Sequence, residues 1–322
     1  MGGKGDFFMI EKKPAPSNSR LKYSHMSFKE NFVLNSEFKV SIDRITIVAD
    51  FLTQKFDRIA RDEFLKYPFI VPSGDGFKVI DNSATSVNNE GNDIVEQVAY
   101  INVPRFQQNK IRIDFNPNHS METEAGEWLL NFIAGLEVKH FTRCDIAFDI
   151  FNYEDVSKYR LWNFGQSQNL YLDRNLKLET AYFGAPSSSK QVRMYNKLIE
   201  QKKRHKEVPI NIDSWWRLEL QLRSKSVLNY PAEVKDMLAN FYYPNWESVK
   251  NPSQKAIVYA MYKEPSIYAG VSKATQQRWR RIFKTSSHHN ELSVILAKVF
   301  VENLNSLDYQ LHSILNRFDV EM

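Results

Sequence analysis

Cysteine is almost missing from this chain of 322 residues, and Cys144 is the single example. One cysteine excludes intramolecular disulfides and cysteine-rich zinc sites, and it fits a reducing cytosol, so we expect a cytoplasmic protein. No apolar run approaches the roughly 18 residues that a membrane-spanning helix needs, so we expect no contact with a membrane. The opening stretch MGGKGDFFMIEKKPAPSNSR lacks the apolar core of a secretory signal and predicts a flexible tail over residues 1–22.

Motifs of several enzyme classes are also missing. The chain has no GxxxxGK[ST] loop, which excludes a P-loop nucleotide hydrolase, and it has no GxGxxG or GxSxG motif. It also lacks the His-x-His pair that one large class of DNA-nicking enzymes uses to bind its metal ion. If this chain nicks DNA, carboxylates must bind the metal.

Basic residues, in contrast, are concentrated in two places. The formal net charge is only +5, but residues 190–206 are rich in Lys and Arg and contain a single Glu. Residues 273–284 contain five Lys or Arg and no acidic residue. Each segment also contains an aromatic residue, and basic patches with interleaved aromatics are typical of surfaces that bind a polyanion. The alternative is that both segments are solvated faces of helices.

Strand patterns dominate the first two thirds of the chain. Helical patterns occur in clumps between them, as in residues 120–138, and not after every strand. This order predicts an α+β fold with a largely antiparallel sheet and packed helices. The Asn- and Gly-rich residues 81–93 predict a turn or hairpin loop. The predicted strands are 38–51, 110–117, 141–151, 178–184, 190–197 and 214–223.

After about residue 225 the pattern becomes helical. The last stretch, 291–318, has apolar residues at spacings of four and three, which predicts a helix that packs on the core or forms a short dimer contact. The other helical segments between 228 and 284 are broken by Pro and Gly.

Charged residues alternate with apolar ones along four of the strands. Residues two apart on a strand share a face. This places Asp145 with Asp149 and puts Asp114 opposite its apolar neighbours; Glu219 lies beside Arg217. The same rule puts Arg193, Tyr195 and Lys197 together on the strand QVRMYNK. A polar sheet face is often simply solvated, and Tyr195 could equally shield sheet surface between two long cationic stems.

Taken together, these strands favour a chemical function. Carboxylates that converge on a sheet face can hold Mg²⁺ or Mn²⁺, which prefer oxygen ligands. A phenol near such a metal can attack a phosphodiester and keep a covalent phosphotyrosyl bond, while nearby cations stabilise the pentacoordinate phosphate. The bond energy is conserved, so the DNA strand can be rejoined without ATP.

Several segments resemble a known family. IRIDFNPN, FTRCDIAFDI, LETAYFGAPSSSKQVRMYNK, WWRLELQL and QKAIVYAMY resemble, in order and spacing, the replication initiators of small Gram-positive rolling-circle plasmids, the Rep_trans family of staphylococcal resistance plasmids. The resemblance covers about residues 40–285. The ETxYFG–turn–RxYxK hairpin followed by WRxE is its most specific part. The family also includes relaxases of integrative conjugative elements.

The resemblance implies a metal-dependent, site-specific DNA nickase and strand transferase with topoisomerase-like chemistry. Tyr195 would be the nucleophile that becomes linked to the 5′ end of the nicked strand, and Lys197 and Arg193 would neutralise the phosphate. Asp145 and Glu219 fall on acidic positions of the family motifs and would bind Mg²⁺ or Mn²⁺. The second choice is Asp149. The last is Asp114, because Glu stands at its position in relatives.

The family resemblance also implies partners. Its members act as homodimers, bind an inverted-repeat origin that extrudes a cruciform, nick it as a single strand and recruit a host helicase of superfamily 1. We therefore expect a catalytic domain over 23–225, an origin-recognition region over 226–286 and a C-terminal helix with a possible dimer contact over 287–322. The residues expected to bind DNA are Lys273, Arg278, Arg280, Arg281 and Lys284.

Two other functions remain open on the sequence. A conjugative relaxase on the same fold would use the same nicking chemistry, and genomic context would be needed to separate it from a plasmid initiator. A DNA-binding regulator that has lost catalysis would keep the fold. The presence of Tyr195, Asp145 and Glu219 argues against the regulator.

Overall fold

The structure is a computed structural model. It describes residues 38–51, 62–87, 93–103, 109–119, 121–163, 166–204, 206, 208–286 and 291–316. The predicted tail over residues 1–22 therefore lies outside the described residues. The described chain has the predicted α+β fold: ten strands form one sheet in the order β2-β3-β4-β5-β1-β6-β11-β10-β9-β8. Every neighbouring pair in this sheet is antiparallel.

The strands agree with the sequence pattern at most positions. The predicted hairpin is present, since Val192 pairs with Phe183 and Tyr195 with Thr180. The strand bounds are β1 Phe38–Asp50, β2 Ile70–Ser73, β3 Gly76–Val87, β4 Asp93–Asn102, β5 Lys110–Phe115, β6 Glu137–Phe151, β8 Gln168–Leu172, β9 Leu178–Phe183, β10 Lys190–Asn196 and β11 Trp215–Arg223; β7 Arg160–Leu161 pairs separately with β12 Phe241–Tyr242.

Two sequence predictions about the strands are wrong. Residues 81–87 are not a loop but the second half of β3, which pairs with β4. Main-chain pairing with β4 outweighs the local turn preference of these Asn and Ser residues. In addition, β10 ends at Asn196, whose side chain accepts a hydrogen bond from the backbone N–H of Ile199 and caps a helix. Lys197 therefore begins helix α3 instead of ending the strand.

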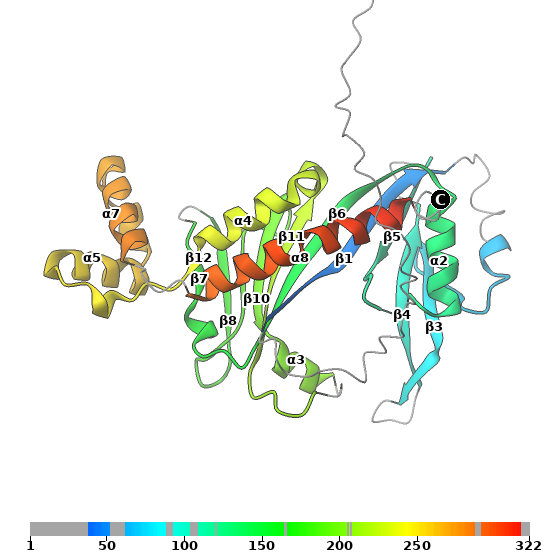
Figure 1. The fold of residues 1–322 in the computed structure, drawn as a ribbon, viewed down its shortest axis with the longest axis horizontal. Coiled ribbons are helices and arrows are strands. Elements are labelled where there is room, and N and C mark those ends of the chain that lie inside the picture. Colours follow the sequence, from blue (N-terminus) through cyan, green and yellow to red (C-terminus); the bar gives the residue numbers. More distant parts are fainter. Residues whose placement is uncertain are drawn as a thin grey trace, which may run out of the picture. The chain divides into compact units, whose positions relative to one another are not determined.

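The helices are unevenly distributed over the sheet. Helices α2, α4 and α8 lie across one face of it (Figure 1). The helix bounds are α2 Glu124–Ala134, α3 Lys197–Lys203, α4 Tyr230–Asn240, α5 Pro252–Lys263, α6 Ser266–Ala269, α7 Lys273–Thr285 and α8 Glu291–Leu315, with short 3-10 turns at Val156–Lys158, Ser224–Asn229 and Trp246–Ser248.

The main core lies between the sheet and these three helices. Phe300 of α8 is fully buried and packs its ring against Phe148 of β6 and Tyr230 of α4. Leu307, Leu311 and other apolar residues of α8 belong to the same core. The prediction of a core-packed C-terminal helix is therefore confirmed, and the dimer contact stays a prediction. The covered face leaves the opposite, charged face of the sheet available for a site.

A second, smaller core holds helices α5 and α7 together. Trp162, Tyr242 and Phe283 meet there, and the rings of Trp162 and Phe283 lie 4.7 Å apart in an edge-on arrangement. This cluster gives the segment from Trp246 to Thr285 its own apolar centre. Within the described residues, no helix has the length and apolarity needed to cross a membrane.

Candidate active site

Tyr195 lies near the end of β10, between two cations as its sequence predicts. The guanidinium carbon of Arg193 lies 3.8 Å from the centre of the Tyr195 ring, and the ammonium of Lys197 lies 5.5 Å from it. Such distances are typical of cation–π contacts. The three side chains thus share one side of the sheet, although Lys197 belongs to α3. The Nε of Arg193 is buried and has no hydrogen-bond partner among the described residues.

The environment of Tyr195 is closed but charged. The residue is only 3% exposed, and its hydroxyl has no hydrogen-bond partner in the described ranges. Burial raises the pKa of Tyr195, whereas the neighbouring guanidinium groups of Arg217 and Arg193 pull that pKa down. Glu219 and Glu200 also raise the pKa of Tyr195. The phenol is therefore protonated at neutral pH, with two arginines near the position where a phenolate would form.

Arg217 joins the tyrosine to the carboxylates. It pairs with Tyr195 across β10 and β11, and with Asp149 across β11 and β6. Its Nε and Nη2 donate to the two carboxylate oxygens of Asp149, both at 2.8 Å, and its Nη1 donates to Asp43 at 2.6 Å. Trp215 also donates to Asp149. Asp149 is consequently fixed as the partner of a buried arginine.

Asp43 is a site residue that the sequence pattern conceals. Between Ile42 and Arg44, β1 has one more residue than β6, so Asp43 is the extra residue of a β-bulge. A bulge changes which face the following side chains take. Ile42 and Ile45 are both fully buried, although strict alternation would put them on opposite faces. The bulge directs Asp43 to the charged face, where it meets Arg217.

Glu219 is the buried carboxylate without a counter-charge in direct contact. It is 8% exposed, and it has no hydrogen-bond or ion-pair partner in the part of the chain that the structure describes. The pKa of Glu219 is raised to about 7, first by burial and then by the nearby carboxylates of Asp43 and Asp145, against the opposite effect of Arg193 and Arg217. A cation bound beside a buried carboxylate with such neighbours would stabilise its charged form.

The other two predicted metal ligands have arginine partners. Asp145 accepts hydrogen bonds from Nε and Nη2 of Arg143, the closest at 2.5 Å. Burial nevertheless raises the pKa of Asp145. Asp114 is held by Arg44 at 2.5 Å and by Arg112 at 3.0 Å. Both carboxylates therefore already have positive partners.

A metal ion would need some rearrangement of this face. Among the described residues, no three His, Cys, Asp or Glu side chains lie together as a ready metal site. The donor chemistry still fits Mg²⁺ or Mn²⁺ at Glu219, because Asp43 and Asp145 are its neighbouring acids and carboxylate oxygens are the ligands these ions prefer. The residues that would hold the ion are Glu219, Asp145 and Asp43.

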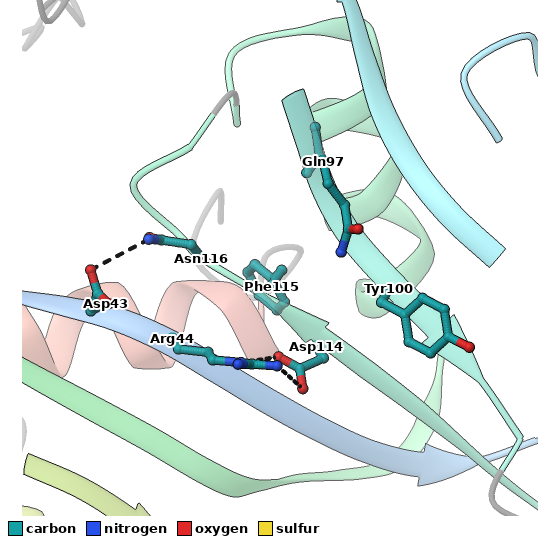
Figure 2. Close-up of a pocket in the computed structure, with 8 residues that line it drawn as sticks. Asp43, Arg44, Gln97, Tyr100, Asp114, Phe115 and Asn116 are labelled. Carbon is teal, nitrogen blue, oxygen red and sulfur yellow. Dashed lines mark hydrogen bonds and ion pairs between the residues drawn. The ribbon is translucent and has the colours of Figure 1, made fainter. Parts of the chain in front are cut away.

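A polar cavity opens beside Asp43. Its volume is about 290 Å³, and it lies between β1, β4 and β5. Figure 2 shows Arg44 extending to Asp114 along one side, and Gln97 and Tyr100 bordering the other. A second bulge, at Val98 of β4, shapes this edge, since Val79 pairs with Ala99 but Ile80 pairs with Gln97. Sequence reasoning did not predict the cavity.

The residues predicted to bind DNA lie together on α7. All five are exposed, and no acidic residue occurs in the helix. Lys273, Arg280 and Lys284 recur at helical spacing on one face, while Phe283 is buried in the second core. The site around Tyr195 does not include them. A turn through Gly270 and Val271 separates α6 from α7, and Ser272 caps α7.

Comparisons with known proteins give related sequences but no family. No family model matches this chain. Two *Staphylococcus aureus* proteins, each named replication initiation protein, are similar to it. One is 25% identical over 297 residues, covering 91% of this chain and 90% of the relative. The other is 24% identical over 306 residues, covering 94% of each. A solved rolling circle replication initiator protein from *Geobacillus stearothermophilus* is 16% identical, covering 68% of this chain and 91% of that one with a TM-score of 0.40.

Proposed function

We propose that this chain initiates rolling-circle replication of a plasmid by nicking one strand of its origin and rejoining strands at termination. The observation that carries the proposal is the environment of Tyr195: a free hydroxyl with Arg193 stacked on its ring and Arg217 opposite on β11. The near full-length similarity to proteins named replication initiation proteins supports it.

The geometry suits a transesterification. The Tyr195 oxygen gives up its proton and attacks the scissile phosphorus, the bond to the 3′ oxygen breaks, and that oxygen takes up a proton and leaves as a hydroxyl, so the step neither gains nor loses protons. The 5′ phosphate stays on the tyrosine. In the reverse step a 3′ hydroxyl attacks the phosphotyrosine and restores the strand.

The cations of the site match the charge that develops in this reaction. Arg193 offers a buried N–H with no partner in the described residues, which a phosphate oxygen can accept. Arg193 and Arg217 lower the pKa of Tyr195 against the effect of its burial, so they reduce the cost of forming the phenolate. Lys197 also lies beside the ring, but its ammonium is paired with Glu200 at 2.5 Å, so a phosphate would compete with that carboxylate for it.

A divalent cation, Mg²⁺ or Mn²⁺, would be held by Glu219 and Asp145, with Asp43 as the added neighbour. When bound, it would supply positive charge for the pentacoordinate phosphate. Asp43 and Asp145 also have arginine partners, but they are the carboxylates that act on Glu219. We assign Asp149 and Asp114 to positioning Arg217 and Arg44.

Helix α7 is proposed to bind the duplex origin. Helices α5, α6 and α7 follow one another with a short turn before α7, which is the order of a helix-turn-helix whose last helix enters the major groove. The exposed cations of α7 would contact phosphates or guanine edges. Duplex binding and nicking would thus belong to separate surfaces.

The homodimer and the host helicase remain parts of the proposal. The outer face of α8 carries exposed Val294 and Val301, which a second copy would contact. A conjugative relaxase is the second candidate function, because the chemistry at Tyr195 would be the same. A regulator without catalysis is disfavoured by the same residues.

The experiment is a covalent-adduct assay. The protein is incubated with Mg²⁺ or Mn²⁺ and a labelled single-stranded oligonucleotide that carries the cognate origin, and DNA-linked protein is detected in SDS. Wild type is expected to form the adduct and Tyr195→Phe to form none. The matched control is Tyr182→Phe, because Tyr182 also lies near Arg193, at 5.8 Å from its guanidinium carbon. An undiminished adduct with Tyr195→Phe would refute the proposal.

A further inference from the structure

The cavity beside Asp43 has the size and lining of a small-ligand site. Its volume of about 290 Å³ lies just below the usual range for drug-sized ligands, roughly 300–1,000 Å³. A single planar heterocycle is smaller than a drug and suits such a space. The cavity is not an accident of loop packing, because two β-bulges, at Asp43 and Val98, border it. Bulges are over-represented next to functional sites.

The polar groups of the cavity are fixed in place, and some of them remain unused. Arg44 donates to Asp114 through Nε and Nη2, which leaves its Nη1 without a protein acceptor in the described residues. The hydroxyl of Tyr100 donates its single proton, shared between Asp75 at 2.7 Å and the backbone carbonyl of Ser73 at 3.1 Å, which fixes the ring at the wall. The pKa of Tyr100 is raised to about 12, first by burial and then by Asp75, so this donor stays protonated.

Gln97 is the residue whose side chain most suggests a ligand in the cavity. It is exposed, its amide has no hydrogen-bond partner among the residues that the structure describes, and it extends from β4 toward the cavity (Figure 2). An amide presents one donor and one acceptor side by side, which matches the edge of a nucleobase and pairs best with adenine. The half-buried ring of Tyr100 offers a surface for base stacking.

The position of the cavity relates it to the nick. Asp43 borders the cavity and accepts a hydrogen bond from Arg217, and Arg217 is the residue paired with Tyr195. Strands β11, β6 and β1 separate Tyr195 from the cavity. A DNA strand whose phosphate reaches Tyr195 would cross these strands to reach it. Arg44 and Arg112 also give the rim positive charge that a sugar–phosphate chain can follow.

We propose that this cavity binds one unstacked nucleobase of the nicked strand, with Gln97 as the residue that reads its edge. The proposal rests on the proposed function for its substrate, single-stranded DNA, but not on the nicking step. Adenine is the expected base because a glutamine amide pairs with it bidentately. The site would then set the register of the strand before Tyr195 attacks.

The test measures binding without nicking. The Tyr195→Phe protein is titrated against fluorescein-labelled strands of twelve abasic units, either without a base or with one central adenine, guanine, cytosine or thymine. Stacking plus hydrogen bonding of one base predicts that adenine improves affinity about tenfold over the base-free strand. Adding Gln97→Ala should reduce this gain to about threefold or less and leave the affinity for the base-free strand unchanged.

The controls separate the possible outcomes. Gln168→Ala alters an exposed glutamine of β8 and should keep the full adenine gain. An unchanged gain in Gln97→Ala, or an equal loss for the base-free strand, would overturn the proposal. So would competition by free deoxyadenosine monophosphate at concentrations close to the strand's Kd, because the site would then serve a free nucleotide. If the wild type forms no adduct but the Gln97-dependent gain is present, the nicking proposal fails and the base pocket stands.

Discussion

The charged face of the sheet and the exposed face of α7 are both rich in arginine, but the arginines of the sheet are paired with carboxylates and those of α7 are exposed to solvent. On the sheet, Arg217 is 12% exposed at its side chain and bonds to Asp149 and Asp43. On α7, Arg278 and Arg281 are exposed, and the helix contains no acidic residue. Buried pairs fix geometry, whereas exposed cations give salt-dependent attraction. This difference assigns chemistry to the sheet and DNA docking to α7.

The largest expected effect comes from Arg217. Arg217→Met would leave the buried carboxylate of Asp149 and the half-buried carboxylate of Asp43 without their partner. Breaking a buried ion pair in this way costs about 3–5 kcal/mol of the free energy of unfolding. The matched change Arg281→Met should alter stability by no more than about 0.5 kcal/mol. Urea unfolding of both variants measures the contrast. A loss below 1 kcal/mol in Arg217→Met would show that the sheet face is no more organised than α7.

The next effect concerns Glu219, where the substitution is expected to raise the free energy of unfolding instead of lowering it. Its raised pKa means that the folded protein binds a proton more readily than the unfolded chain between about pH 4.5 and 7. The charged carboxylate therefore lowers stability above pH 7, and this penalty disappears as the pH falls below 4.5. A shift of this size is worth roughly 3 kcal/mol. Glu219→Gln should be more stable than wild type at pH 8 by up to that amount, and equally stable near pH 4.

The same variant tests the metal. Mg²⁺ or Mn²⁺ at pH 8 should raise the Tm of wild type, because the ion binds the folded state, and should leave the Tm of Glu219→Gln nearly unchanged. Thermal melts with and without the ion, with Glu247→Gln as a control on the surface turn Trp246–Ser248, give the answer. An equal rise in all three proteins would place the ion elsewhere.

The smallest effect per residue is expected on α7. Arg281→Ala should weaken binding to duplex origin DNA and lower the slope of log K against log salt by about 1, because one phosphate contact is lost. Adduct formation on a single-stranded oligonucleotide should not change. Fluorescence anisotropy at several salt concentrations measures the slope. A fall in adduct formation equal to the fall in duplex binding would contradict the separation of the two surfaces.

Most of the fold follows from alternation in the sequence. Asp145, Asp149 and Glu219 lie on the charged face because each has apolar neighbours that enter the core, and the hairpin of β9 and β10 follows from its Ala-Pro-Ser turn. The same rule identified Arg193 and Tyr195 as facing the same way, and the structure brings them into contact. Local patterns are sufficient here because a strand has only two faces.

The rest of the site depends on where alternation fails. Asp43 has the same parity as the buried Ile45 and Ile47, so its place on the charged face requires the bulge that only the pairing of β1 with β6 reveals. The sequence pattern also does not show that Asp145 and Asp114 are paired with arginines, because those pairs depend on side-chain positions in the folded sheet. The cavity needs three strands from separate parts of the chain, and no short motif marks it.

The most direct measurement is to locate the DNA-linked residue. After reaction with a single-stranded origin oligonucleotide, the adduct is digested with nuclease and protease, and the peptide that carries the nucleotide is sequenced by mass spectrometry. The account predicts a 5′-phosphonucleotide on Tyr195 within the segment MYNK. A nucleotide on Tyr182, or on any residue other than Tyr195, would contradict it.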